Sequence, residues 1–284
     1  MQLPYPDALL IYSSKIQARR LSTNLQFKKP PVNEVVCGVQ FDDIRGWSTA
    51  HYGLFWNEVR EEYPNTEDQP PLVPFGIGGA QQSMPTLHIV PPLRRVWLIN
   101  RQPQFLIQFQ PDRFYYNWRH RGDDYPRYPS IIKKFEKAKT HLEAFTSELK
   151  LGTIKPVDCE LTYINHILQG QGWESIGDLP KVIPDFSWQR EKHDFLPNPT
   201  NVAWQVRFEL PEKKGWLNVK LNQATRKTDG IPSLILDLTA KGLGDDKTAK
   251  AMRNWFDLAH EWIVRGFTEL TAKEIQETFW KREK

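Results

Sequence analysis

The side chains best suited to chemistry lie between residues 110 and 124, where acidic, guanidinium, amide and imidazole groups alternate with aromatic residues. The candidates are Asp112, Arg113, Asn117, Trp118, Arg119, His120, Asp123 and Asp124. Carboxylates beside guanidinium groups can bind a charged ligand, or they can pair with each other. An arginine fork matches a carboxylate in two hydrogen bonds, and buried polar groups need partners. We favour a hydrogen-bonded structural corner over a binding site, and both interpretations stay open.

The remaining motifs predict no catalytic or metal centre. The acids lack the spacing of a calcium or zinc motif. The seven histidines are scattered, and no serine lies in a Gly-x-Ser-x-Gly turn. Cys37 and Cys159 fall on the apolar faces of predicted strands, where a cysteine behaves as a small hydrophobic residue. We therefore predict no catalytic residue and no cofactor.

The elements that position these polar residues are a strand and a helix. Phe105, Ile107 and Phe109 recur with the period of two that is typical of a half-buried strand. Pro111 must bend or end that strand, because proline cannot donate a hydrogen bond to the ladder. A helix is predicted to open at residue 129 or 130 and to end near Gly152, with one apolar stripe facing the core.

Two segments resemble those of a known group of proteins. The first comprises Gln110-Pro111-Asp112-Arg113, Asn117-Trp118-Arg119, Tyr125-Pro126 and Tyr128, and the second is Pro30-Pro31-Val32-Asn33-Glu34-Val35-Val36. They resemble the central signature and the proline-rich opening of a sporadically distributed, largely uncharacterised bacterial family. The resemblance covers roughly residues 28–280 and implies no catalytic residues. The patchy occurrence of that family resembles that of genes in mobile, anti-phage defence or toxin–antitoxin loci.

The same strand pattern occurs twice in the chain. Its two copies are Val35, Cys37, Val39, Phe41 and Val157, Cys159, Leu161, Tyr163. Each half then has an irregular interval, further antiparallel strands and one long amphipathic helix. The last helix is predicted to start at residue 245 or 246, and residues 65–92 are predicted to be irregular. We predict an α+β fold of duplicated antiparallel sheet units, each covered by its helix, in a helix-grip or SecB-like arrangement.

The predicted organisation is an N-terminal arm (1–27), a first half (28–152) and a second half (153–284), with both halves forming one compact unit. The 284 residues are 39% hydrophobic and 25% charged, with a net charge of +4. This composition is typical of a globular protein and is less basic than that of a dedicated nucleic-acid binder. The N-terminus lacks the features of a signal peptide, and no apolar run approaches the roughly 20 residues of a membrane span. We therefore expect a cytoplasmic protein.

Three functional hypotheses follow. The first is a non-enzymatic interaction or sensor subunit of a bacterial multi-gene system, homo-oligomeric and bound to a protein partner encoded nearby. The second is a binder of an apolar ligand, a lipid or nucleic acid in a cleft. The third is a metal-dependent hydrolase or nuclease that uses Asp112, Asp123, Asp124 and His120. A filled core with an exposed apolar patch would favour the first, an open aromatic cavity the second, and converging acids the third.

Overall fold

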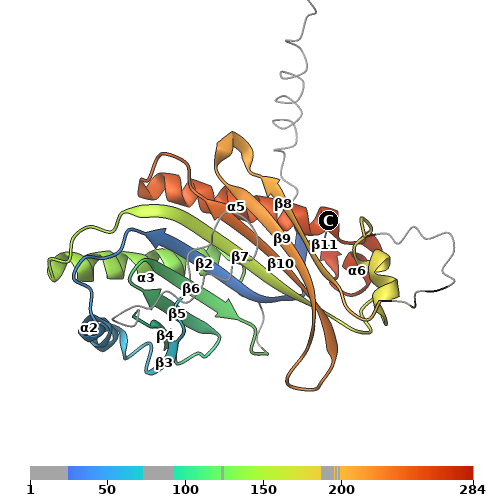
Figure 1. Ribbon diagram of the computed structural model, residues 1–284, viewed down its shortest axis with the longest axis horizontal. Helices are drawn as coiled ribbons and strands as arrows, with labels where there is room; N and C mark the ends of the chain where they lie inside the picture. The colour runs from blue at the N-terminus through green and yellow to red at the C-terminus, as the bar shows by residue number, and fades with distance from the viewer. Residues whose placement is uncertain are drawn as a thin grey trace, which may run out of the picture.

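One nine-stranded antiparallel sheet forms the centre of the protein (Figure 1). The computed structural model describes residues 25–72, 93–122, 125–186, 195, 197 and 199–283. The strand order is β3-β4-β5-β6-β2-β7-β10-β9-β8. The strands are β2 (Val32–Phe41), β3 (Asn65–Gln69), β4 (Arg95–Ile99), β5 (Phe105–Gln110), β6 (Arg113–Arg119), β7 (Pro156–Leu168), β8 (Ala203–Glu209), β9 (Trp216–Thr225) and β10 (Pro232–Gly242). The predicted α+β class with a large antiparallel sheet is confirmed.

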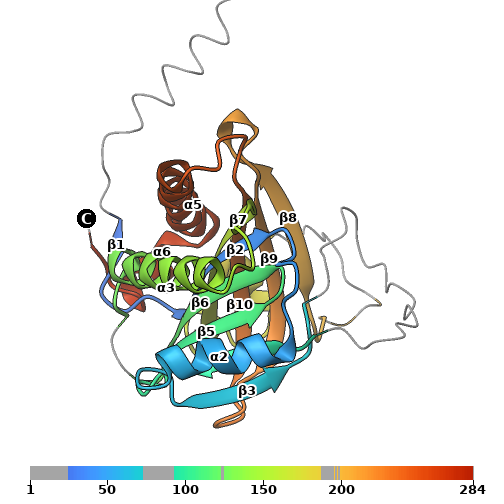
Figure 2. The same ribbon diagram turned by 90° about the vertical axis from the view of Figure 1, so that its left-hand side faces the viewer.

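Two long helices cover one face of this sheet (Figure 2). Helix α3 (Tyr128–Glu148) packs on β6 and β2, and α5 (Ala249–Leu270) packs on β7 and β10. The shorter elements are α2 (Thr49–Val59), α4 (Leu179–Val182), α6 (Lys273–Thr278) and the 3-10 turns η1 (Ile176–Asp178) and η2 (Pro211–Lys213). None of the described helices is long and apolar enough to cross a bilayer.

The helix-facing side of the sheet follows from the alternation in the sequence. Cys37 pairs with Tyr116 of β6 and Leu161 of β7, and Val39 pairs with Cys159, so these positions share one face. All five are buried. Side chains alternate across a strand, so one correct register places a whole apolar set under the helices. Each fully buried large apolar side chain contributes about 1.5–3 kcal/mol, which makes a register slip costly.

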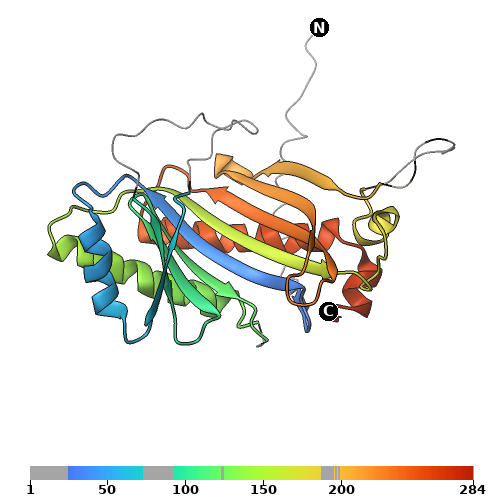
Figure 3. The same ribbon diagram turned by 60° about the horizontal axis from the view of Figure 1, so that its bottom comes forward.

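The opposite face of the sheet is turned away from α3 and α5 (Figure 3). It carries polar residues that are nevertheless buried, among them Gln108, Asn117 and Thr162. Gly38 lies on this face opposite Tyr115 of β6. A Cβ atom at Gly38 would lie only 2.1 Å from Cδ1 of the Tyr115 ring, so the ring occupies the space that a side chain would need. Tyr115 thereby covers the centre of the polar face and is itself buried.

The first strand of each half lies at the middle of the sheet. β2 and β7 are neighbours, and the last strand before each long helix, β6 or β10, lies beside its own first strand. The sheet is therefore continuous across the two halves. The first half contributes five strands and the second contributes four. Internal duplication and the helix-grip arrangement stay predictions at this point.

A small second sheet joins the two ends of the described chain. β1 (Gln26–Phe27) pairs with β11 (Arg282–Glu283). The Phe27 ring packs edge-on against Phe267, with 5.8 Å between ring centroids. Residues 26 and 27 thus belong to the folded body rather than to an arm, and residues 1–24 lie outside the part that the structure describes.

Two element predictions were wrong in informative ways. Asn65–Gln69 is the edge strand β3, although its residues are all polar and were predicted to be irregular. An edge strand that is exposed on both faces needs no apolar alternation. Helix α5 begins at Ala249, because Thr248 Oγ1 accepts a hydrogen bond from the Ala251 N–H and caps the helix, while Asp246 only precedes this cap.

Candidate functional site

The structure does not gather the sequence-predicted polar residues into one cluster. Asp112 and Arg113 lie at the start of β6, and Arg119 lies at its end. Six residues of extended strand separate Arg113 from Arg119 by about 20 Å. Asp123 and Asp124 lie outside the described residues. The group divides into a corner at one end of β6 and a polar chain toward the other.

The corner is a tight hairpin between β5 and β6, which we call the hairpin corner (Gln110, Asp112, Arg113). Arg113 is 2% exposed and donates from Nε and Nη2 to the two carboxylate oxygens of Asp112, at 3.1 and 2.7 Å. Gln110 Nε2 donates to Asp112 Oδ1 at 2.6 Å, and its own Oε1 accepts from the Leu72 N–H. The carboxylate and the guanidinium satisfy each other within the chain.

The other predicted residues have separate surroundings. Asn117 is buried, donates to Glu34 at 2.6 Å and accepts from Gln108 at 2.8 Å. Arg119 donates to the Pro103 carbonyl and lies over the ring of Trp97. Burial raises the pKa of Glu34, although the Asn117 bond opposes this shift.

Trp118 points to the helix-facing side instead, because it is paired with Val35 and Phe105. Its ring centroid lies 5.1 Å from that of Tyr125. His120 is exposed, and its backbone N–H donates to the Asn33 carbonyl. Trp118 is therefore the predicted residue that contacts Tyr125, which lines a pocket of the protein.

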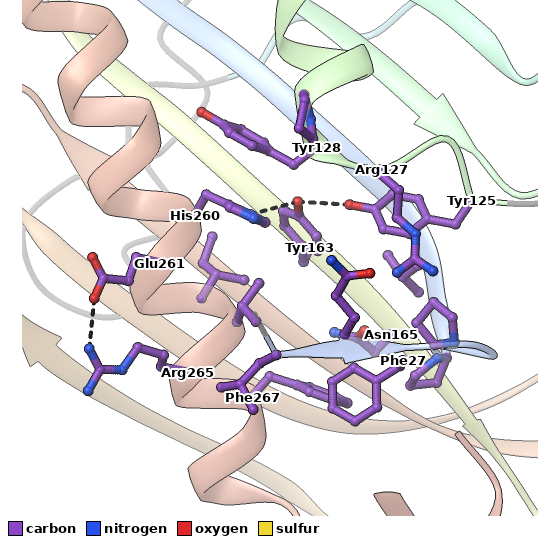
Figure 4. Close-up of a pocket in the computed structure, with 18 residues that line it drawn as sticks. Phe27, Tyr125, Arg127, Tyr128, Tyr163, Asn165, His260, Glu261, Arg265 and Phe267 are labelled. Atoms are coloured by element: carbon purple, nitrogen blue, oxygen red, sulfur yellow. Dashed lines mark hydrogen bonds and ion pairs between the residues drawn. The ribbon is translucent and has the colours of Figure 1, made fainter. Parts of the chain in front are cut away.

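A pocket of about 640 Å³ lies between α5 and the sheet, at the N-terminal end of α3 (Figure 4). We call it the relay pocket. Its wall combines Phe27 of β1, the segment Pro30–Val32, Tyr125 and Arg127 before α3, the first two residues of α3, two residues of β7, and the face of α5 from His260 to Phe267. Pockets of this size hold drug-sized ligands, and they often lie between helices and sheets.

An irregularity in β2 shapes the floor of the relay pocket. Val32 pairs with Asn165, whereas Glu34 pairs with the adjacent Ile164, so Asn33 is an extra residue in β2. Such a bulge re-aims side chains and is frequent beside active sites. Val32 and Asn165 both line the pocket, and the buried Asn165 amide donates to the Leu236 carbonyl at 3.1 Å.

Three neutral groups form a hydrogen-bonded chain across the pocket. Tyr125 Oη lies 2.9 Å from Tyr163 Oη, which lies 3.0 Å from His260 Nδ1 (Figure 4). Burial raises the pKa of both tyrosines. Burial lowers the pKa of His260 to about 4, so its imidazole is neutral at pH 7. We call these three residues the relay.

A second contact fixes the His260 ring. Tyr128 stacks on it with 4.0 Å between ring centroids and 7° between the planes. The Tyr128 hydroxyl donates to Asp257 Oδ1 at 2.8 Å. The imidazole of His260, a residue of α5, is therefore stacked on Tyr128 of α3 and hydrogen-bonded to Tyr163 of β7. One side chain thus joins both long helices to the sheet.

Arg127 at the pocket rim has an unusual backbone conformation. Its φ of 66° and ψ of 151° fall in a region that is essentially reserved for glycine. Arg127 is also the N-cap residue of α3, and it provides no side-chain cap. Its guanidinium lies 5.8 Å from the Tyr125 ring centroid. Strain of this kind clusters at ligand-binding sites and persists only where its surroundings impose it.

Among the described residues, no three His, Cys, Asp or Glu side chains are grouped to hold a metal ion. No family model, curated protein or solved structure matches the chain. The site must therefore be interpreted from its own geometry.

Sequence patterns did not reveal the relay. Tyr163 is separated from Tyr125 by 38 positions and from His260 by 97, so no local spacing links them. The only signal in the sequence was that Tyr163 lies on the apolar, inward face of a predicted strand, together with Cys159 and Leu161. Tyr125 and Tyr128, which are part of the family resemblance, do line the pocket.

Proposed function

We propose that the protein is a non-enzymatic, cytoplasmic sensor subunit that binds a small organic ligand in the relay pocket. The observation that carries this proposal is a pocket of about 640 Å³ whose walls come from both halves of the chain. A ligand there would contact β1, β2, α3, β7 and α5 together. Its binding free energy would thus stabilise the packing of these elements against one another.

The chemistry of the lining favours binding over catalysis. The described lining contains no Ser, Thr, Cys or Lys, the usual nucleophiles of covalent catalysis. His260, with a pKa of about 4, is a weak base at neutral pH. The relay is suited to orienting a ligand through hydrogen bonds.

The sensor role rests on where the N-terminal segment joins the body. Leu25 lines the pocket, and it directly follows the first 24 residues of the chain. Ligand binding would therefore act at the junction of that segment. We propose that the segment contacts a protein partner, and that ligand occupancy changes this contact. The bacterial multi-gene setting of such a partner, in a defence or toxin–antitoxin system, rests on the family resemblance.

A thermal-shift panel tests the binding function. Naphthalene and octyl compounds carrying a carboxylate, a carboxamide or an amine give six probes that separate shape from charge. At least one should raise the melting temperature of the wild type. Val264→Trp should abolish that shift, because Val264 lines the pocket and tryptophan would fill it. Glu269→Trp, on an exposed position of the same helix, is the matched control and should keep the shift. No shift with any probe, or an equal shift in Val264→Trp, would contradict the function.

The homo-oligomer is a separate proposal that the far edge of the sheet supports. β8 lies at the edge of the sheet, because β9 is its only partner among the described strands. Phe208 and Trp216 on these strands are 41% and 44% exposed. Edge strands with exposed apolar side chains favour pairing with another chain. We propose that a second copy covers this edge. Light scattering should give a dimer, and Phe208→Lys should give a 33.3 kDa monomer; a monomeric wild type would end the proposal.

We also propose that the two halves arose by duplication of a helix-grip-like unit. The matching positions of β2 and β7, and of β6 and β10, support this origin. The burial of Cys37 and Cys159 at corresponding strand positions supports it too. Superposition of residues 33–150 on 156–280 should align these strands, and a mismatch in their order would contradict the duplication.

A further inference from the structure

Among the described residues that line the relay pocket, the charges do not cancel. Arg265 is paired with Glu261 on α5, with 2.7 Å between Nη1 and Oε1, so this pair contributes little net charge. His260 is neutral. Arg127 has no carboxylate partner among the described residues, and its guanidinium lies over the Tyr125 ring. The first turn of α3, which begins beside it, contains no acidic residue. The described lining therefore has a net positive charge on the Arg127 side.

The charged and aromatic parts of the pocket are arranged in order. Figure 4 shows Arg127 and Asn165 on one side, and His260 and Glu261 on the other. The Tyr163 ring lies between them and the Tyr125 ring lies on the Arg127 side, with Phe27 and Phe267 lower in the view. Proline rings at positions 30, 31 and 129 add flat apolar surface. A planar apolar body with one charged end matches this arrangement.

The relay can offer the Tyr125 hydroxyl as a hydrogen-bond donor to a ligand on the Arg127 side of the pocket. In one arrangement Tyr125 donates to Tyr163, which donates to His260 Nδ1, and the imidazole carries its proton on Nε2. In the other, His260 Nδ1–H donates to Tyr163, which donates to Tyr125, and the Tyr125 hydroxyl proton is free to point outward. The two arrangements have the same heavy-atom positions, so a ligand can select between them. An acceptor-only group near Arg127 selects the second.

We propose that the ligand of the relay pocket is a planar aromatic carboxylate. Its carboxylate would accept hydrogen bonds from the Arg127 guanidinium and the Tyr125 hydroxyl, and its ring would lie against the aromatic wall. Guanidinium forks match carboxylates in geometry and charge. The strained backbone of Arg127 is then explained, because it holds the guanidinium at the rim of the pocket. This inference rests on the proposed binding function and names its ligand class.

Calorimetry with three matched probes tests the ligand class. The probes are 2-naphthoate, its neutral isostere 2-naphthamide, and octanoate, which has the charge without the planar body. We expect 2-naphthoate to bind about ten-fold more tightly than either of the others, as for a charge-assisted bond in a partly buried site. Arg127→Gln should reduce the naphthoate-to-naphthamide ratio to about one. Arg121→Gln, an exposed arginine of the same loop, is the matched control and should preserve the ratio.

Each other outcome overturns a defined part of the proposal. If 2-naphthamide binds as tightly as 2-naphthoate, the ligand need not be an anion. If octanoate binds as tightly, the ligand need not be planar. The proposed binding function would stand in both cases. A preserved ratio in Arg127→Gln would remove the assigned residue. If none of the three binds, the ligand class is wrong, and the six-probe panel then decides whether the binding function is wrong as well.

Discussion

The hairpin corner and the relay pocket both bury polar groups, but they use them differently. In the hairpin corner, Asp112 receives both arms of the Arg113 fork and a third bond from Gln110. In the relay pocket, three neutral groups that line the cavity form a chain, and the cation Arg127 lies beside it without a carboxylate partner among the described residues. A closed set of bonds stabilises a fold, whereas an open set is available to a ligand.

The difference also appears in the backbone. Arg113 lies in a regular strand, paired with Gln40 and Gln110. Arg127 occupies a conformation that costs of order 1–3 kcal/mol in a residue other than glycine. The corner therefore lowers the free energy of the fold, and the pocket rim raises it. The proposed role of Arg127 in ligand binding would account for this conformation.

The largest expected effect is the loss of stability when the Arg113–Asp112 pair of the hairpin corner is broken. Arg113→Ala would leave the Asp112 carboxylate without its fork, and removing one partner of a buried pair costs about 3–5 kcal/mol. Asp112 is 21% exposed, which favours the lower end, about 3 kcal/mol. Arg113→Lys should recover part of the loss, because it restores the charge without the fork. Urea denaturation measures both variants, and an unchanged midpoint for Arg113→Ala would mean that the corner is not structural.

The relay should produce a pH dependence of stability. His260 faces Tyr163 from β7, Tyr128 from α3, and Asp257 and Glu261 from its own helix. Its pKa is about 4 in the folded protein, against about 6.5 when unfolded. The unfolded state therefore binds more protons between pH 6.5 and 4, and stability falls as the pH falls through this window. The full loss corresponds to about 3 kcal/mol.

Other groups titrate as well, so the control must isolate His260. Burial raises the pKa of Glu34 and Asp237, which gives a trend of the opposite sign. The difference in unfolding free energy between wild type and His260→Gln, measured at several pH values, cancels these contributions. If that difference stays constant from pH 7 to pH 4, His260 does not have a depressed pKa and the relay assignment is wrong.

The smallest expected effect is a gain in stability on replacing Arg127 with glycine. Arg127→Gly should raise the unfolding free energy by about 1 kcal/mol, because relief of backbone strain exceeds the added entropy of the unfolded chain. The same variant should lose the carboxylate preference of the pocket. Lys150→Gly is the control: its φ of 56° lies just beyond the end of α3, remote from the pocket lining. It should be neutral or stabilising and keep normal binding. A destabilised Arg127→Gly would show that this arginine supports the fold.

The sequence was sufficient for most of the fold. Alternation located the strands of the central sheet, as with Phe105, Ile107 and Phe109 of β5. Periodicity located α3 and α5 to within a few residues. It failed at β3, where an exposed edge strand leaves no apolar signal. Burial of one face produces the apolar alternation by which a strand is predicted, so a strand without a buried face cannot be predicted in this way.

The candidate site was less accessible from the sequence. The pairing of Asp112 with Arg113 could be anticipated, because the two residues are adjacent at a hairpin. The relay could not, since it depends on the packing of α5 over β7 and on the placement of Tyr125 beside Tyr163. Contacts that are distant in sequence are fixed by the register of the whole sheet, which no local pattern reveals.

The most direct test measures stability and binding on the same three proteins. Wild type, Arg113→Lys and Arg127→Gln are each melted and then titrated with 2-naphthoate below their melting temperatures. The account predicts that Arg113→Lys melts lower and binds as tightly as wild type, whereas Arg127→Gln melts at or above wild type and loses most of its affinity. The reverse pattern, with binding lost in Arg113→Lys and kept in Arg127→Gln, would contradict it and make the hairpin corner the functional site.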